Sequence, residues 1–408
     1  MNWRMRLGKS WGRLGMKFNI WKNCPKIPIT ELLSFIVDNR GKTVPTSDEG
    51  WKLIATNCVT NNTLFPVYEK VRYLTHETYE TWFRAHPIPG DILFVNKGTP
   101  GRVCMVPDPV DFCIAQDMIA LRADDEKIYN KYLFAVLRSR EIQQQIYNTN
   151  VGDVIPHFKK QFMKQLLIPV PDRWIQEVIG DIYYELSYKT ELNKKINENL
   201  LQQAQALYNH SFPYTVSDIL PEGWRLGTVS EIIEIHDSKR IPLSGAQRDK
   251  MKKKIYPYYG AASLMDYVDE YIFDGKYLLL GEDGTVVDDA GFPILQYVWG
   301  QFWVNNHAHI LTGKLGYNVE SLYMLFKQTP VKSIVTGAVQ PKISQANLKS
   351  IPVVIPPANL IRAFNNQVNE MFALIRNIEE ENKSLATLRD SLLPKLMSGE
   401  IDLSALDI

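Results

Sequence analysis

Basic and amide side chains beside glycine- and proline-rich turns are the residues of this sequence whose types and spacing point most clearly to a binding chemistry. Lysine and arginine bind phosphate oxygens, and arginine, lysine, asparagine and glutamine on loops can read base edges in a DNA groove. The candidates are Arg40, Lys42, Lys97, Arg102, Lys159 and Lys160 in the first half, and Lys239, Arg240, Arg248, Lys252, Lys253, Lys254, Gln340 and Lys342 in the second. The run from Lys252 to Lys254 leads into Tyr256, Tyr258 and Tyr259, an interleaving that favours backbone contact with some stacking. Each candidate taken singly has the alternative of being a solvated surface side chain.

Two groups of residues raise the possibility of a metal site. His307 and His309 would place two imidazoles on one face of a strand, but the sequence shows no evident third ligand. An acidic loop offers oxygen ligands for a divalent ion, namely Glu282, Asp283, Asp288 and Asp289. Structural histidines and a solvated β-turn are the more common outcomes, so we predict no metal site.

Motifs of nucleotide and methyl-group chemistry are absent from the sequence. A DNA methyltransferase needs a glycine-rich cofactor loop and an Asn/Asp-Pro-Pro-aromatic turn, whereas Pro356-Pro357 is preceded by Ile355 and followed by Ala358. No G-x-x-x-x-G-K-[ST] loop occurs, so ATP hydrolysis is not expected of this chain. We therefore predict that the chain has no catalytic residues and binds no cofactor.

Composition excludes several broad classes of protein. The 408 residues carry a formal charge of +1, with 45% hydrophobic and 22% charged residues, which excludes a polybasic binder and wholesale disorder. Four cysteines without a C-x-x-C pair indicate neither a zinc site nor a disulfide framework, and favour a cytoplasmic protein with reduced thiols. No apolar stretch approaches the roughly 20 residues that span a bilayer, so no membrane partner is expected. For residues 1–16 we expect a disordered basic extension. Its origin stays open between a natural segment and one derived from a vector.

An internal repeat organises the chain. Residues 151–171 read VGDVIPHFKKQFMKQLLIPVP, and residues 336–356 read TGAVQPKISQANLKSIPVVIP. The matched pairs, each 185 positions apart, are Gly152 with Gly337, Pro156 with Pro341, and Pro171 with Pro356. Glycine and proline fix backbone geometry, so three such matches in one register predict a duplicated structure.

A long amphipathic segment follows each repeat block. Apolar residues recur there at alternating spacings of three and four, which predicts two long helices packed on a coiled-coil-like seam. The predicted seam residues are Ile182, Leu186, Ile196 and Leu200 on the first helix, and Phe364, Met371, Ile375, Ile378 and Leu385 on the second. Asn193 and Asn382 also fall at seam positions, where a polar residue can fix the register at some cost in stability; an exposed asparagine is the equal alternative.

The predicted fold is therefore α+β, with two mixed, strand-rich heads separated by two long antiparallel helices in a pseudo-two-fold arrangement. The expected boundaries are 17–171 for the first head, 172–213 for the first helix, 214–356 for the second head, 357–400 for the second helix and 401–408 for a tail. The heads differ in sequence more than the segments at their exits, which predicts two different ligands on one scaffold.

From about residue 17 onward the chain resembles the specificity subunit of a type I restriction–modification enzyme. Besides the order head, helix, head, helix, the resemblance rests on GDILF from Gly90, IYPYYGAA from Ile255, the block from Gly337 to Pro341, and LRDSLLPKLMSGE from Leu388. The sequence departs from the family at Ala262-Ser263, where Asn-Gly is frequent, and this affects only the local turn.

The resemblance implies a subunit that reads DNA without catalysing a reaction. Each head would be a target-recognition domain for one half of a bipartite double-stranded site, and the helices would set the gap. The helices would also dock modification (methyltransferase) subunits, expected to be two, and the assembly would recruit restriction subunits that cleave DNA. S-adenosylmethionine, ATP and magnesium are then expected in the partner subunits. Two alternatives stay open at this point, a self-contained two-headed DNA-modifying or DNA-cleaving enzyme and a coiled-coil scaffold without DNA.

Overall fold

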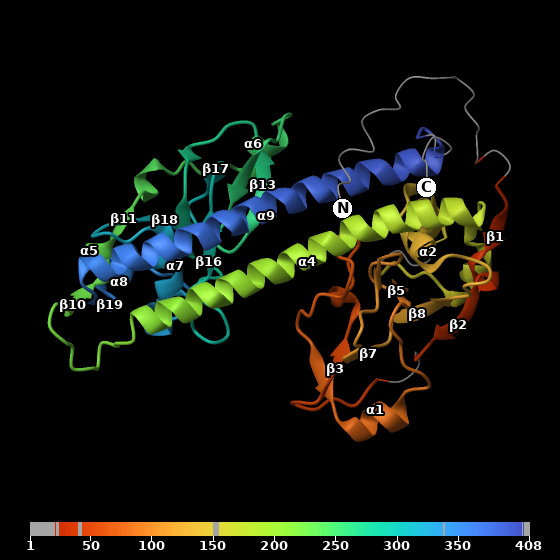
Figure 1. The fold of residues 1–408 in the computed structure, drawn as a ribbon, viewed down its shortest axis with the longest axis horizontal. Helices are drawn as coiled ribbons and strands as arrows, with labels where there is room; N and C mark the ends of the chain where they lie inside the picture. Colours follow the sequence, from red (N-terminus) through yellow and green to blue (C-terminus); the bar gives the residue numbers. More distant parts are fainter. Residues whose placement is uncertain are drawn as a thin grey trace. The chain divides into compact units, whose positions relative to one another are not determined.

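The computed structural model describes residues 21, 24–39, 43–149, 155–337, 339–401 and 403 (Figure 1). The expected extension 1–16 and the candidates Arg40 and Lys42 lie outside these residues. Contacts divide the described chain into two compact units. The first unit runs to Lys195 and resumes at Glu379, and the second spans Ile196–Ile378. Each unit combines one strand-rich head with parts of both long helices.

The first head is built around a four-stranded antiparallel sheet with the order β2-β8-β5-β6. A smaller sheet has the order β4-β3-β7, and β1 pairs with β9. The strands are β1 (Lys26–Pro28), β2 (Leu33–Val37), β3 (Trp51–Ile54), β4 (Arg72–Leu74), β5 (Ile92–Val95), β6 (Val103–Met105), β7 (Phe112–Ile114), β8 (Met118–Ala123) and β9 (Leu167–Pro169). The helices are α1 (His76–Trp82), α2 (Asn130–Leu137) and α3 (Arg140–Asn148), with short η2 (Ile29–Glu31), η3 (Thr56–Cys58) and η4 (Lys160–Gln165).

Strand β5 shows why a continuous apolar run forms the centre of this head. Successive side chains of a strand point to opposite faces, yet all four residues of β5 are buried. Ile92 and Phe94 pack in the cluster that contains α2, whereas Leu93 and Val95 pack in a second cluster with β7. The main sheet is therefore covered on both faces, and its central strand must be apolar on both.

The second head repeats this construction. Its main sheet has the order β11-β18-β15-β16, its smaller sheet the order β13-β12-β17-β14, and β10 pairs with β19. The strands are β10 (Arg225–Thr228), β11 (Ile233–Ile235), β12 (Tyr256–Tyr259), β13 (Leu264–Val268), β14 (Phe273–Asp274), β15 (Tyr277–Gly281), β16 (Leu295–Val298), β17 (Gln301–Val304), β18 (Ala308–Gly313) and β19 (Pro352–Ile355). The helices are α5 (Val229–Ile232), α6 (Gly245–Asp249), α7 (Val319–Phe326) and α8 (Gln345–Ser350), with η5 (Asp237–Lys239) and η6 (Lys332–Ile334).

The main sheets of the two heads match strand by strand. In the first head the central strand β5 lies between β8 and β6. In the second head β15 lies in the same way between β18 and β16. The smaller sheets share an unusual feature, because β3 pairs in parallel with β7 and β12 pairs in parallel with β17. The predicted duplication and the α+β class are therefore confirmed.

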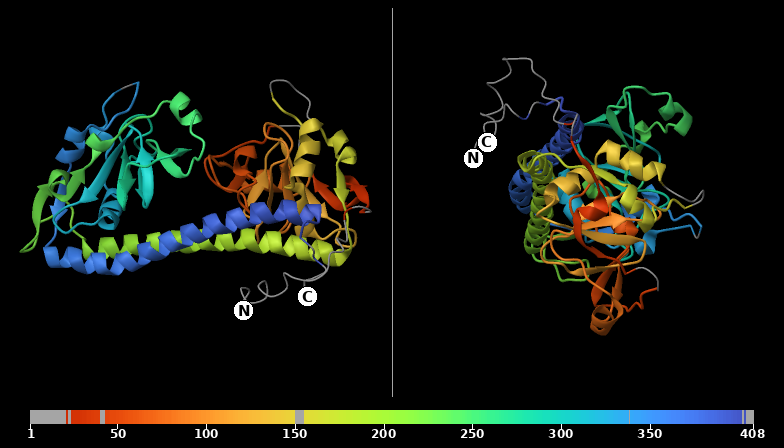
Figure 2. Two further views of the ribbon diagram at one scale, coloured as in Figure 1. Left: turned by 90° about the horizontal axis from the view of Figure 1, so that it is seen from above. Right: turned by 90° about the vertical axis from the view of Figure 1, so that its right-hand side faces the viewer.

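Two long helices, α4 (Arg173–Ser211) and α9 (Ala358–Ser398), pack together within each unit (Figure 2). In the first unit Asn193 of α4 contacts Asn382 of α9, and the ring of Tyr183 lies 5.8 Å from the Arg389 guanidinium. A lower number on α4 thus meets a higher number on α9, which makes the pair antiparallel. In the second unit Tyr208 packs edge-on against Phe364 with ring centroids 5.3 Å apart.

The seam differs in part from the sequence prediction. Phe364, Ile375 and Ile378 are buried, and Ile182, Leu186, Leu200, Met371 and Leu385 are partly buried. Ile196 was predicted wrongly, because 43% of it is exposed. Polar residues are buried on α4 instead, at Ser187, Thr190, Asn193 and Asn197.

Local hydrogen bonds explain how polar residues occupy this seam. The hydroxyls of Ser187 and Thr190 donate to the carbonyl oxygens of Tyr183 and Leu186, one helical turn earlier, at 2.9 Å each. Such bonds satisfy a buried hydroxyl without a partner on the other helix. Asn193 instead donates from Nδ2 to Oδ1 of Asn382 at 2.9 Å, a contact that ties the register of α4 to α9.

The far part of α9 belongs to the core of the first unit. Leu393 and Leu396 are buried in the same apolar cluster as Ile175 and Ile179 of α4 and helix α2 of the first head. The first unit is therefore completed by residues that follow the second head in the sequence.

Candidate nucleic-acid interface

In the first head, the candidates converge on the turn that follows β5. Gly98 at the tip of this turn has φ of +86°, and no atom lies within 4 Å of where a Cβ would be. Its N–H donates to the Pro156 carbonyl at 3.0 Å, and the Phe158 N–H donates to the Asn96 carbonyl at 2.8 Å. These bonds join the turn to the segment before η4, so Lys97 lies beside that segment.

The remaining described candidates of this head lie at the same end of the main sheet. Arg102 is exposed where the β5–β6 turn closes, with its carbonyl accepting from the Val95 N–H. Lys159 and Lys160 are exposed on the tethered segment. Lys160 Nζ donates to Oδ2 of Asp38 at 3.0 Å, just beyond the end of β2. The structure thus brings together Lys97, Arg102, Lys159 and Lys160.

The second head builds the same end of the sheet with other side chains. Gly284, with φ of +84° and open space around its Cβ direction, donates its N–H to the Pro341 carbonyl at 3.0 Å. The Ile343 N–H donates to the Glu282 carbonyl at 2.8 Å. Pro341 and Ile343 each follow their counterparts Pro156 and Phe158 by 185 positions, so the predicted repeat has a direct structural meaning.

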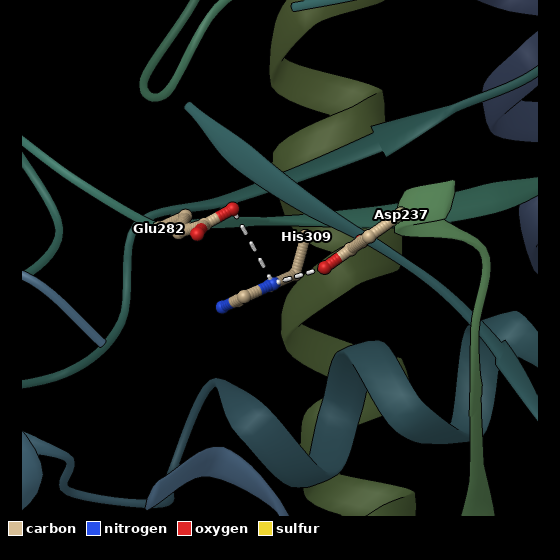
Figure 3. Close-up of side chains that lie close together, drawn as sticks. All are labelled: Asp237, Glu282 and His309. Carbon is tan, nitrogen blue, oxygen red and sulfur yellow. Dashed lines mark hydrogen bonds and ion pairs between the residues drawn. The ribbon is translucent and has the colours of Figure 1, made fainter. Parts of the chain in front are cut away.

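A buried charged cluster holds three loops of this second head in place. Figure 3 shows the His309 ring between the carboxylates of Asp237 and Glu282. Its Nδ1 lies 2.6 Å from Asp237 Oδ2 and 3.7 Å from Glu282 Oε2, and its Nε2 lies 2.8 Å from the Ile343 carbonyl oxygen. Both ring nitrogens therefore lie within hydrogen-bond distance of an oxygen atom.

The same cluster also bears on the metal question. Ligand atoms of Asp237, Glu282 and His309 lie within 4.8 Å of one another. Glu282, however, already bonds Arg240 Nη1 at 2.5 Å and lies 3.2 Å from Lys342 Nζ. Two protein cations therefore balance the carboxylates, which suits the cluster to linking the loops that carry residues 237–240, 282–284 and 340–343.

The two histidines do not form the pair considered from the sequence. His307 lies in the turn before β18, where its Nδ1 bonds Asp283, whereas His309 is fully buried within β18. The expectation that both imidazoles share one face of a strand is wrong, because the strand begins only at Ala308.

Exposure separates the candidates at this end of the second head. Lys239 and Gln340 are exposed, and Lys342 is exposed while it pairs with Glu282. The Arg240 side chain is only 13% exposed and donates to Glu282 and to the Ala308 carbonyl. Arg240 is thus placed to hold its loop, whereas the other three can reach a ligand.

A second basic group lies on the smaller sheet of this head. Arg248 Nη1 and Lys254 Nζ bond the two oxygens of Asp266 on β13, at 2.9 and 3.2 Å. The backbone N–H groups of Lys252, Lys253 and Lys254 all donate to the Asp269 carboxylate, at 3.0, 2.8 and 2.7 Å. The side chains of Lys252 and Lys253 are exposed, so the loop is fixed while these two cations face solvent.

The stacking expected from the neighbouring tyrosines is limited by burial. Tyr258 is only 1% exposed, and its hydroxyl accepts from the Leu243 N–H at 3.1 Å, so its ring cannot stack on a base. Tyr256 and Tyr259 are half-buried. The pattern of lysines before tyrosines could not separate a core ring from an exposed one.

The sequence reasoning missed the residues that anchor the loops. Asp38 and Asp237 begin matched segments. Each accepts a hydrogen bond at Oδ2 from a residue near the C-terminal end of its head. The donor is Lys160 Nζ at 3.0 Å in the first head and Gln345 Nε2 at 2.6 Å in the second. Lys160 and Gln345 are also 185 positions apart, so the repeat contained the signal.

Asp237 makes the second cluster sensitive to acid. Burial by itself raises the pKa of this carboxyl, but bonds from His309 and from the Ile310 N–H, with the charge of Arg240, hold the pKa below its ordinary value. A lowered folded pKa adds stability above the unfolded pKa of about 4, and this stability is lost as the pH falls through the folded pKa.

We expect Asp237→Asn to destabilise the second head by about 3 kcal/mol near neutral pH, because an amide donor would face donors and Arg240, 3.5 Å away, would lose a charge partner. Urea unfolding at several pH values measures the effect, and the deficit should shrink below about pH 4. The exposed Asp289→Asn change serves as control and should leave stability unaltered. An equal deficit at pH 3 and pH 7 would contradict the assignment.

Among the described residues, no helix combines the length and the apolar character that crossing a bilayer requires. This includes α4 and α9, whose lengths of 39 and 41 residues would suffice.

Comparisons with known proteins agree with this construction. The model of the type I restriction modification DNA specificity domain matches residues 41–202 and again residues 221–385. The type I restriction enzyme MjaIX specificity subunit of Methanocaldococcus jannaschii is 21% identical over 345 residues, which covers 76% of this chain and 78% of that protein. A putative type I restriction enzyme specificity subunit of Haemophilus influenzae, S.HindORF215P, is 31% identical over 132 residues, 32% of this chain and 33% of that protein.

A solved structure shares the fold. The S subunit of a type I restriction-modification system from M. genitalium matches with a TM-score of 0.58 at 18% identity, covering 94% of this chain and 99% of that one. Two matches to one domain model across most of the chain, on a duplicated α+β fold with two packed helices, lead to one assignment. The chain belongs to the type I restriction–modification DNA specificity family, as a non-catalytic subunit with two target-recognition domains.

Proposed function

We propose that each head reads one half of a bipartite double-stranded DNA target through the loops at the end of its main sheet. The observation that carries this proposal is the same loop construction built twice with different side chains. The turn tips at Gly98 and Gly284 are open, and the exposed groups near them include basic and amide residues. One scaffold with two different surfaces suits two different half-sites.

The proposed partners follow from the family to which the chain belongs. We infer that modification subunits dock on α4 and α9 and supply S-adenosylmethionine and the methyl-transfer chemistry. Restriction subunits would join that assembly and use ATP and magnesium. The chain itself would bind no cofactor and would act in the cytoplasm.

The pure chain is expected to show no methyl transfer and no cleavage. The test incubates the 408-residue chain with duplex DNA and radiolabelled S-adenosylmethionine, and in parallel with ATP and magnesium. Label should enter DNA only after modification subunits are added. Methyl transfer or cleavage by the chain alone would favour the two-headed enzyme, and failure of the complex to select any sequence would favour a scaffold without DNA.

A further inference from the structure

The tip of the β12–β13 hairpin in the second head carries exposed apolar side chains whose role is unassigned. The turn closes where the Gly260 N–H donates to the Ser263 carbonyl at 2.9 Å. Leu264 and Met265 follow at the start of edge strand β13 and are 42% and 53% exposed. Two neighbouring apolar residues this exposed at a hairpin tip need a reason.

Met265 is exposed but held in one place. Asn305, only 4% exposed, directs its Nδ2 at the Met265 sulfur at 3.3 Å. The sulfur also occupies the space that a side chain at position 260 would need, since a Cβ on Gly260 would lie 2.4 Å from it. Most exposed methionines are free to change rotamer, so this arrangement prepares a fixed apolar contact surface.

The hairpin tip adjoins the loops already described. Asn305 accepts from the His307 N–H through Oδ1 at 2.8 Å, and the His307 carbonyl accepts from the Glu282 N–H at 2.8 Å. A Cβ on Gly281 would lie 3.4 Å from the Ala261 carbonyl oxygen. The tip therefore lies at the same end of the head as the Gly284 turn.

The other end of the hairpin carries the exposed cations. Lys252 and Lys253 lie where Asp269 binds their backbone, directly after β13, and α6 packs beside this strand (Figure 1). Asp269 follows Met265 by four positions along the chain, about 14 Å at the usual rise of a strand. The major groove of B-DNA is about 12 Å wide and admits a two-stranded ribbon. A tip in the groove would thus leave the lysines at the flanking phosphates.

We propose that the β12–β13 hairpin is a base-reading element of the second head. Leu264 and Met265 contact the 5-methyl group of thymine in the major groove, and Lys252 and Lys253 bind the phosphates beside it. This inference rests on the proposed function and names the element that reads. The matching edge strand of the first head, β4, exposes Arg72 instead, so the two heads would read different chemistry.

The test removes one methyl group from the DNA. The complex with modification subunits selects its site from a randomised duplex library, and each thymine of the second half-site is then replaced by deoxyuridine. At one or two positions we expect binding by the wild type to weaken about fourfold. Met265→Ala and Leu264→Ala should each abolish the effect at the thymine whose methyl group that side chain contacts, because the partner of the methyl group is gone.

Controls separate this inference from the proposed function. Leu226→Ala, at a 56% exposed apolar residue on β10, should keep the full response to deoxyuridine. Lys252→Ala and Lys253→Ala should each lower the salt slope of binding by about one unit. A second half-site without thymine, or equal deoxyuridine effects in wild type and both hairpin variants, would overturn the hairpin assignment. If the library yields no selected sequence, the proposed function itself fails.

Discussion

Exchanging residues 20–171 for a head of different specificity is expected to change one half of the DNA target completely and to leave the other half intact. The structure gives this exchange suitable ends, because β1 and β9 pair antiparallel with Lys26 opposite Pro169. The head thus enters and leaves the scaffold at one place. Its main sheet and loops lie entirely between these strands, so the reading surface moves with the segment.

The grafted head must still fit helix α4. Lys131 Nζ and the Tyr129 hydroxyl both donate to Oδ1 of Asp181 on α4 at 2.8 Å, and a Cβ on Gly180 would lie 2.6 Å from the Tyr132 nitrogen. A donor head should therefore keep a cation at the position of Lys131. Mapping methylated sites in a host that carries the exchanged subunit measures the outcome, and exchange of residues 214–356 is the matched control. A change in both half-sites after either exchange would rule out independent readers.

Lengthening α4 and α9 by four residues each is expected to widen the gap between the half-sites by about two base pairs. Four helical residues add about 6 Å of rise, and DNA rises about 3.4 Å per base pair. Insertion after Lys195 in α4 and after Ile378 in α9 keeps the Asn193–Asn382 contact in register. The insertion also adds about 40° of rotation beyond a full turn, so activity should fall while the new spacing holds.

Sequencing of methylated sites gives the gap directly. Insertion into α4 alone is the control, because it shifts one helix against the other and should lower stability as buried polar groups lose their partners. An active enzyme that carries both insertions and keeps its original gap would show that the helices do not set the spacing.

Much of the architecture could be predicted because the sequence pattern that encodes it is duplicated. Glycine and proline restrict backbone geometry, so their matched positions predict matched loops. The structure has these loops, since the carbonyls of Pro156 and Pro341 accept equivalent hydrogen bonds from Gly98 and Gly284. The seam was harder, since a search for apolar periodicity selects Ile196 and passes over the buried Asn197. Polar side chains satisfied within their own helix give no such pattern.

The candidate site shows a similar division. The sequence identified which loops carry cations, but it could not show that Arg240 is bonded to Glu282 or that Tyr258 is buried. Those outcomes depend on contacts between residues far apart in the chain. The same holds for Met265, whose position is set by Asn305 and by the missing side chain of Gly260.

The placement of Leu393 and Leu396 in the core of the first unit has a consequence for synthesis. A ribosome makes the first head and α4 early, yet these two residues emerge roughly two hundred positions after Ile179, which belongs to the same apolar cluster. Until then α4 leaves the ribosome with one apolar side uncovered. A chain cut short before Glu379 would retain the second head, and the damage would appear in the half of the protein that was translated first.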